Sequence, residues 1–415
     1  MINASSYKPR ICPILGDVDS VEIDRAQAID PTIALNREKV EEIGREEVVG
    51  YLKKSPTIGY RLTQLEYGSI EFWQKLVNSS VKGANGEDAI TLDDFKTPYF
   101  DICAYLTDDD GTFRGTYMYP ALRASGFGLG IGDPQARIER TFDFVGESAI
   151  IWQGLNKYVI YGKHTCGSGD DNEIDLSTSA SPTPAEDPDN AGIYMLRVVR
   201  VRAGVSTILA LGTDYTYETA GILVITTVTT GDVIKYCYTS ADAPDVIFTP
   251  NDDDPSALLG DCASIYLYIP ASGKPSASDY VYRLQSITFD VKFDREDLRE
   301  IGNKDVVQRG IKNSTVTANL GRILETFTIE EILRGEVAGY GKIDVEKLTD
   351  EVALIVKVFT DNTKTTFAYG FKMTKMSPTD LKGGATVAEY IKADNTLTGE
   401  DMIISADESI IGIEA

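Results

Sequence analysis

The sequence contains the same pattern twice, and this duplication limits the possible fold more than any other feature. The segment RAQAIDPTIALNREKVEEIGREEVV begins at Arg25, and RLQSITFDVKFDREDLREIGNKDVV begins at Arg283, an offset of 258 residues without a gap. Ten of these 25 positions are identical. A repeat has to be identified before any element is assigned, because a missed repeat misassigns the whole fold.

Three further pairs of segments follow in the same order, at offsets between 253 and 259 residues. They are LEYGSIEFW from Leu65 with LETFTIEEI from Leu324, YLTDDDGTF from Tyr105 with VFTDNTKTT from Val358, and IERTFDFVGESAII from Ile138 with IKADNTLTGEDMII from Ile391. Four blocks in register indicate that a whole domain has been duplicated.

The chain length fits this duplication. A chain of 415 residues exceeds what one hydrophobic core usually supports and suggests two to three domains. Between the repeats, polar stretches rich in Pro, Ser and Asp begin at Gly167 and Thr249 and enclose a strand-dense block. We therefore predict a first repeat domain at residues 1–155, an inserted domain at 156–270 and a second repeat domain at 271–415.

Both repeats carry the sequence signals of β-strands. Apolar and β-branched residues alternate or cluster at 57–67, 99–107, 112–119 and 138–152 in the first repeat, and at 314–325, 352–360, 365–373 and 387–397 in the second. The turn sequences DDDG at Asp108 and DNTK at Asp361 each separate two of these strands, which predicts a hairpin at the same place in both repeats. A calcium loop at DDDG is excluded because its glycine is misplaced and its final ligand position falls on Tyr119.

Each repeat also predicts one helix. In the first repeat Ser69 can cap the segment SIEFWQKLVN, and in the second Thr328 and Glu331 form a capping box at the start of TIEEIL. The expected fold class is therefore mainly β with α+β elements: two tandem β-sandwich domains, each with a flanking helix. The inserted block adds a small immunoglobulin-like β-sandwich, because its short strands are separated by Gly, Asp and Thr turns.

Two further segments are interpreted as irregular. NREKVEEIG and DREDLREIG begin at Asn36 and Asp294, which can cap a helix. They end at Gly44 and Gly302, so each predicts a short charged helical turn that leads into an exposed loop. The spacing and context of GFGLGIG at Gly126 do not fit a dinucleotide fingerprint. We therefore interpret this segment as a flexible loop.

The charge balance argues against a protein that grips DNA. The formal net charge is −24, whereas DNA-binding proteins use clustered Lys and Arg to displace counterions from phosphates. Acidity can serve solubility alone. It can also form a surface past which DNA moves without adhering, and the charge by itself does not decide between the two.

No residue pattern indicates catalysis. The single histidine, His164, stands two residues before Cys166, and two ligands cannot complete a four-ligand zinc site. A GxSxG nucleophile motif and a P-loop are both lacking. We expect no enzymatic activity, no cofactor and no metal. Five scattered cysteines without a CxxC are typical of free thiols in a chain made in the cytoplasm, and we expect neither an export signal nor a membrane span.

The segment EEIGREEVVGYLKKSPTIGYRLTQLEYGSIEFWQKLV resembles the major tail tube proteins of tailed bacteriophages. In that family a strand, a charged EIG turn, a loop, a strand ending in LEYGS and a helix follow in this order. The second repeat departs from the pattern, with LETFT in place of LEYGS. The inserted block LGTDYTYETAGILVITTVTTGDVIKYCYTS is similar to β-rich segments that decorate phage tails and other virion proteins.

This resemblance implies a fold and an assembly. Tube domains of the family are small β-sandwiches with a flanking helix, and six of them close their sheets into a ring with a continuous inner barrel. A chain with two such domains is expected to form homotrimeric, pseudo-hexameric rings that stack into the tail tube of the virion. The implied partners are the chain itself, the tape measure, terminator and baseplate proteins, and DNA that passes through without adhering.

The candidate contact residues lie in the two EIG segments. The residues predicted to contact neighbouring subunits or rings are Arg37, Glu38, Gly44, Arg295, Glu296 and Gly302. The alternative is a solvated charged turn. Two other functions stay open: a distal tail, terminator or baseplate ring protein on the same fold, and a carbohydrate-binding surface protein that uses the inserted domain. The only tryptophans, Trp73 and Trp152, lie outside the strand-dense block, which disfavours the second.

Overall fold

The computed structural model describes residues 10–15, 23, 26–40, 50–77, 82–84, 88–107, 113–153, 158–167, 172–177, 183–187, 189, 191–202, 205–218, 221–242, 257–270, 280–281, 284–298, 308–323, 351–384 and 391–412. The fold is mainly β, as the sequence predicted. The chain forms two compact units: the first contains residues 1–24, 99–122 and 146–253, and the second contains 25–98, 123–145 and 254–415.

The second unit contains one long ladder of strands. Its order is β22 (Phe367–Gly384), β23 (Lys392–Gly399), β20 (Gln308–Ile323), β19 (Leu284–Leu298), β8 (Phe113–Ile131), β9 (Glu139–Gly146), β5 (Thr57–Leu65) and β2 (Ala26–Ala34). β8 contributes its residues 123–131 to this ladder. The paired strands run antiparallel, and the ladder joins strands of both repeats.

One face of this ladder is buried and the other is open to solvent. Along β9, Arg140, Phe142 and Phe144 are buried, whereas Thr141 and Asp143 between them are partly exposed. This alternation follows from the period of two in a strand. We call the open side the polar face; on β5, β9, β19, β20 and β23 it carries Thr57, Gly59, Arg61, Thr63, Glu139, Thr141, Asp143, Val145, Thr288, Asp290, Lys292, Asp294, Thr315, Thr317, Asn319, Gly321, Lys392, Asp394, Thr396 and Thr398.

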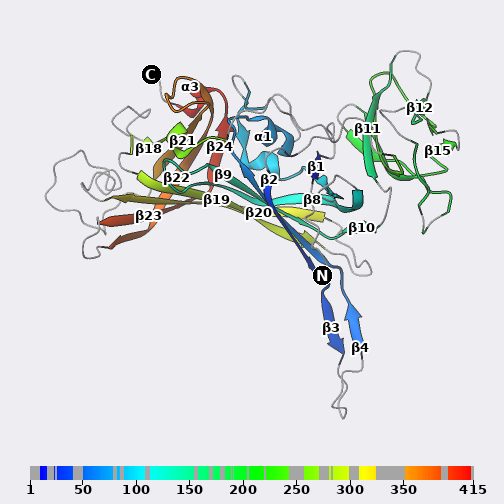
Figure 1. Ribbon diagram of the computed structural model, residues 1–415, viewed down its shortest axis with the longest axis horizontal. Coiled ribbons are helices and arrows are strands. Elements are labelled where there is room, and N and C mark those ends of the chain that lie inside the picture. The colour runs from blue at the N-terminus through cyan, green and yellow to red at the C-terminus, as the bar shows by residue number, and fades with distance from the viewer. Residues whose placement is uncertain are drawn as a thin grey trace, which may run out of the picture. The chain divides into compact units, whose positions relative to one another are not determined.

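Trp73 stands at the centre of the core of this unit. It belongs to α1 (Glu71–Leu76), which lies over one face of the sheet (Figure 1), and its side chain is fully buried. The centroids of Phe127 and Phe142 lie 5.0 Å from that of Trp73, and Phe371 lies at 5.5 Å in an edge-on arrangement. The predicted first helix is confirmed, although it is shorter than expected, and Phe371 shows that both repeats share this core.

The LEYGS segment forms the turn between β5 and α1. The Oε1 atom of buried Glu66 accepts hydrogen bonds from the N–H groups of Tyr67 and Gly68 at 2.9 and 2.7 Å. Its Oε2 atom accepts from Arg140 at 3.2 Å and from the Tyr369 hydroxyl. Burial lowers the pKa of Arg140 and the Glu66 carboxylate raises it, and the net shift is upward, so the guanidinium stays charged. Gly68 has a φ of 80°, which favours glycine.

Shorter strands complete the second unit. β21 (Val352–Phe359) lies between β18 (Ala263–Tyr268) and β22, and β24 (Asp401–Ser405) pairs with the other side of β22 and with β6 (Ile90–Thr91). One turn of 3-10 helix follows β6 at Leu92–Phe95, another precedes β18 at Gly260–Cys262, and α3 (Glu408–Ile411) follows β24. The DNTK turn joins β21 to β22, which confirms the second predicted hairpin.

The EIG segments are strands in the part that the structure describes, so the predicted helical turns are wrong. β3 (Arg37–Val40) pairs with β4 (Gly50–Lys53) and continues the β2–β5 ladder as a two-stranded hairpin (Figure 1). Asn36 caps no helix: its amide donates to the Ser55 carbonyl and to Thr57 Oγ1, both at 2.9 Å. In the second repeat the equivalent residues 294–298 belong to β19 and pair with β20.

The GFGLGIG segment is also a strand, and the predicted flexible loop is wrong. It forms the end of β8 between β9 and β19. A Cβ atom on Gly126 would lie 2.6 Å from the Val291 carbonyl oxygen, and one on Gly128 would lie 2.6 Å from Asp290 Oδ1 and 2.8 Å from the Phe289 oxygen. The glycines are therefore required by the close approach of β19.

The first unit contains a short sheet and the inserted β-sandwich. β7 (Phe100–Thr107) lies between β1 (Arg10–Leu15) and residues 113–122 of β8, and β10 (Ile150–Gln153) pairs with the other side of β8. The inserted sandwich has a sheet of β11 (Tyr158–Thr165), β17 (Val233–Ser240), β13 (Met195–Arg202) and β14 (Val205–Ile208). Its other sheet contains β12 (Glu173–Asp175), β16 (Ile222–Ile225) and β15 (Tyr215–Glu218). Both sheets contribute to one apolar core, as the sequence predicted.

The strand order repeats with the sequence. The order β8-β9-β5-β2 of the first repeat corresponds to β22-β23-β20-β19 of the second, and a bulge falls at Ala124/Gly126 in β8 and at the equivalent Pro378/Asp380 in β22. The pairs β1-β7, β7-β8 and β8-β10 likewise correspond to β18-β21, β21-β22 and β22-β24. β18, which lies within the predicted inserted segment 156–270, is thus the counterpart of β1 and belongs to the second unit.

Candidate assembly surface

The two repeats are joined edge to edge by β8 and β19. The register runs from the pair Ile287–Ile131 to the pair Lys292–Gly126. On the buried face of the ladder, Phe293 of the second repeat is only 4% exposed. Its ring centroid lies 5.8 Å from that of Phe95 and 5.9 Å from that of Phe127, both in the first repeat. The junction therefore combines main-chain pairing with an apolar contact.

A charged side chain strengthens the same junction. Arg295 donates from Nε to the Ala124 carbonyl at 2.5 Å and from a terminal nitrogen to the Phe95 carbonyl at 3.1 Å. Hydrogen bonds from a charged donor are stronger than neutral ones. Arg295 thus ties the second repeat to the first, at the point where β19 continues toward its hairpin.

The equivalent residues of the first repeat are not covered in this way by any described part of the chain. Val291 and Phe293 are 1% and 4% exposed, whereas their counterparts Ile33 and Leu35 are 41% and 59% exposed. Among the described strands, β2 pairs only with β5 and is the end of the ladder. The outer side of β2 is therefore an open edge with an apolar strip.

A second open edge lies at the other end of the ladder. Residues 380–384 of β22 pair with β23 on one side, and no described strand pairs with their other side. In β8 the equivalent side is the one that β19 occupies. The two open edges thus correspond to the two edges that meet in the β8–β19 junction.

Acidic groups outnumber basic ones on the polar face. The acidic residues on the strands that define it are Glu139, Asp143, Asp290, Asp294 and Asp394, and the basic ones are Arg61, Lys292 and Lys392. Arg61 is engaged by Asp143 through two hydrogen bonds of 2.8 and 3.0 Å, which raise the pKa of the arginine. Threonine hydroxyls occupy much of the remaining surface, so this face offers little to attract phosphate.

The structure describes four of the six predicted contact residues. Arg37 and Glu38 lie on the exposed hairpin, where Lys54 pairs with Glu38 at 2.5 Å. Arg295 and Glu296 lie on β19, and Arg295 alone of these reaches across to the other repeat. Gly44 and Gly302 lie outside the described residues. Sequence reasoning missed Ile33 and Leu35, although the alignment of Leu35 with Phe293 could have indicated a conserved apolar position in both repeats.

A buried carboxylate attaches the inserted sandwich to the short sheet of the first unit. Asp101 on β7 is fully buried and pairs with both terminal nitrogens of Arg197 on β13. It also accepts from the Tyr161 hydroxyl at 3.3 Å and from the Ala121 N–H at 2.8 Å. Burial lowers the pKa of Arg197, the Asp101 carboxylate raises it, and the net shift is upward. The sandwich is therefore anchored by charge and hydrogen bonds.

The same face is covered differently in the two repeats. Cys103 on β7 packs with Val159 and Cys237 of the inserted sandwich. Its counterpart on β21 is Ile355, which packs with Ile411 of α3. The insert and α3 follow equivalent strands, β10 and β24, so each repeat uses the next segment of chain as its cover.

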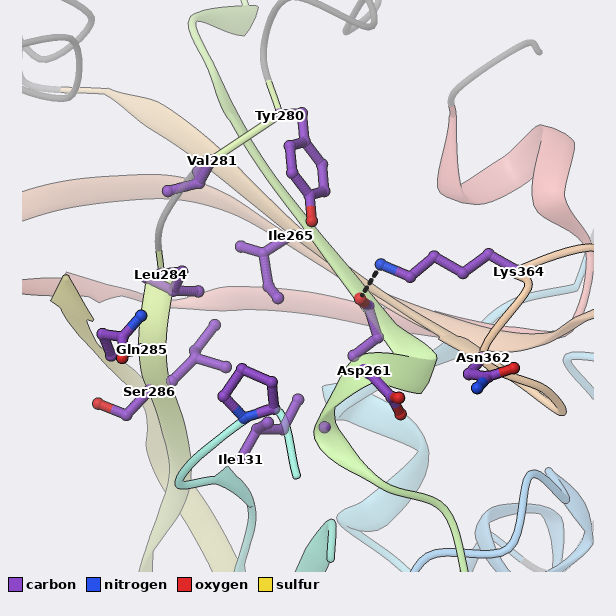
Figure 2. Close-up of a pocket in the computed structure, with 14 residues that line it drawn as sticks. Ile131, Asp261, Ile265, Tyr280, Val281, Leu284, Gln285, Ser286, Asn362 and Lys364 are labelled. Carbon is purple, nitrogen blue, oxygen red and sulfur yellow. Dashed lines mark hydrogen bonds between the residues drawn. The ribbon is translucent and has the colours of Figure 1, made fainter. Parts of the chain in front are cut away.

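The second unit also contains a cavity of about 330 Å³ near the start of β19 (Figure 2). Asp261, Tyr280 and Lys364 are among its lining residues, with apolar side chains such as Leu284. The Lys364 ammonium donates to the Ala263 carbonyl at 2.8 Å and lies 5.8 Å from the Tyr280 ring centroid. Burial lowers the pKa of Lys364. Because the ammonium is already engaged, the cavity gives no argument for catalysis.

Metal and membrane sites find no support in the described part of the chain. His164 lies in β11 and Cys166 is buried in the core of the inserted sandwich. The described residues contain no group of three or more His, Cys, Asp and Glu side chains that could hold a metal ion. None of the described helices combines the length and apolarity needed to cross a bilayer.

Comparison with known proteins does not place the chain in a family. No protein-family model matches the sequence, and a search of curated proteins finds no match.

Proposed function

We propose that this chain is a structural tail tube protein of a tailed bacteriophage, and that its trimeric rings stack around a channel through which DNA passes. The proposal is carried by one observation: the repeats join edge to edge through β8 and β19, and no described strand pairs with the two equivalent edges, on β2 and β22. A heterologous contact that repeats by rotation closes into a ring. Three chains would supply six tube-like repeats.

The polar face fits the wall of such a channel. Closing the ladder into a barrel removes its exposed edges and leaves one face inside. Glu139, Asp143 and Asp290 on this face would repel the phosphate backbone, and the Arg61 cation among them is paired with Asp143. Under this proposal the net charge of −24 keeps the genome from adhering during delivery.

The attachment of the inserted sandwich distinguishes the first repeat from the second within the proposed ring. It attaches through Asp101 and Arg197 to the first repeat alone, while α3 covers the equivalent face of the second. A trimeric ring would therefore carry three inserted domains, at alternate repeats. In the virion such a tube would meet the tape measure protein inside it and the terminator and baseplate proteins at its ends.

Electron cryomicroscopy of the purified chain, with native mass spectrometry of the smallest particle, tests the proposal. We expect rings of three chains with six similar lobes, and stacks of these rings at higher concentration. Single rings that never stack would favour a distal tail, terminator or baseplate role. A chain that stays monomeric at high concentration, or rings of six chains, would contradict the proposed function.

A further inference from the structure

The open edges of the chain allow the contact between two chains to be specified residue by residue. Strand pairs in the β8–β19 junction are fixed by the register of the structure: Thr288 lies opposite Gly130, and Val291 lies opposite Phe127. The repeat alignment places Asp30 and Ile33 where Thr288 and Val291 stand. The β8–β22 correspondence, with its matching bulges, places Gly384 and Leu381 where Gly130 and Phe127 stand.

We infer that β2 of one chain pairs antiparallel with residues 380–384 of β22 in a second copy of this chain, with Asp30 opposite Gly384 and Ile33 opposite Leu381. This inference rests on the proposed ring assembly and names the surface that forms it. The occupant is a second copy because the chain already shows the same contact internally, with the same strand types and the same bulge.

The side chains of the two edges suit this register. Ile33 and Leu35 are exposed, while Leu381 on the facing strand is half-buried, so pairing would cover apolar surface on both chains. On the opposite side Thr32 would face Lys382, which now pairs with Asp380 at 2.6 Å and is exposed.

Leu35 and Arg37 would then contact the second copy in the way that Phe293 and Arg295 contact the first repeat. The counterpart of Arg37, Arg295, donates to three carbonyl groups of the first repeat, and Phe293 packs against Phe95 of that repeat. Leu35 and Arg37 stand at the equivalent positions and are exposed. In the assembled ring Leu35 enters an apolar site of the second copy, and Arg37 donates to its main chain.

Engineered disulfides test the register. The double variant Asp30→Cys with Gly384→Cys is assembled and then oxidised by dissolved oxygen with a copper catalyst, which removes one electron and one proton from each thiol. The within-chain control is Thr288→Cys with Gly130→Cys, whose positions are close because a Cβ atom on Gly130 would lie 3.8 Å from Thr288 Cγ2. The described native cysteines at 103, 166, 237 and 262 are buried, which limits competing reactions.

The outcomes separate this inference from the proposed function. We expect the monomer band to be replaced by a covalent trimer on non-reducing gels, and the control pair to link without an increase in mass. The shifted pair Asp30→Cys with Lys382→Cys should link much less. Normal rings in which the shifted pair links as well or better would overturn the register and leave the ring intact. If the wild-type chain forms no ring, both proposals fail.

A substitution without cysteine gives a second readout. Leu35→Asp should leave the chain folded and monomeric, because it places a charge in the apolar contact. The matched control is Ile208→Asp, which changes a side chain that is 69% exposed on the inserted sandwich and should leave rings unchanged. Rings of normal stability with Leu35→Asp would contradict the inferred contact.

Discussion

Replacing Arg197 with methionine should loosen the attachment of the inserted sandwich to β7. The change leaves the Asp101 carboxylate, which is 0% exposed, with only the Tyr161 hydroxyl and the Ala121 N–H as described partners. Removing one member of a buried ion pair costs about 3–5 kcal/mol. Since the Arg197 side chain is 22% exposed, we take the lower end, about 3 kcal/mol, which is about a hundredfold in an equilibrium constant.

Native-state hydrogen exchange suits this test, because a chain of several domains does not unfold in one step. We expect amides of β7 and β11 to exchange about a hundredfold faster in Arg197→Met than in the wild type. The matched control is Arg61→Met, which removes an Arg–Asp pair with side chains 54% and 38% exposed and should cost at most about 1 kcal/mol. If the Arg197 variant exchanges less than about threefold faster, the anchoring role assigned to the pair is refuted.

Two further predictions concern β8 and the inserted sandwich. Gly128→Val should destabilise the β8–β19 pairing by about 1–3 kcal/mol, measured by native-state hydrogen exchange of the β8 and β19 amides, because its Cβ would meet Asp290 and the Phe289 carbonyl. The control is Gly132→Val, where a Cβ meets nothing within 4 Å, and it should cost less than half as much. The Arg202 guanidinium holds the pKa of Asp232 well below its ordinary value of 3.8. The ionised carboxylate therefore stabilises the folded sandwich fully at pH values above 3.8, and this stabilisation is lost as the pH falls below 3.8. Acid unfolding followed by near-UV circular dichroism should show this loss, and Arg202→Gln should flatten the dependence; an unchanged acid midpoint in the variant would count against the assignment.

Hydrophobic periodicity predicted most of the strands. It did not predict strands such as β3, which form because a neighbouring strand pairs with them. β5, β7 and β21 lie close to their predicted bounds because alternating or continuous apolar runs mark them directly. The segment after Asn36 has the charges and capping residues of a helix, yet it forms β3 because it continues the β2–β5 ladder and pairs with β4. Tertiary pairing overrides local propensity there.

The candidate site was predicted in part. Arg295 was chosen from a charged turn, and its actual role depends on the carbonyls of Ala124 and Phe95, which no local pattern reveals. GFGLGIG was interpreted as a flexible loop once a dinucleotide fingerprint was excluded, whereas only the position of β19 shows that a side chain at Gly128 would clash with the neighbouring strand. The Asp101–Arg197 pair spans 96 residues of sequence, so a single sequence offers no signal for it.

The β8–β19 junction also has a kinetic consequence. Its two edges are tethered by the chain and meet within one molecule, whereas in the proposed ring β2 and β22 of different chains would have to meet by diffusion. Each chain can therefore complete its internal pairing before it encounters another copy. In the proposed ring, each diffusing chain would carry one edge of each type, so collisions between chains would have to form only one of every two junctions.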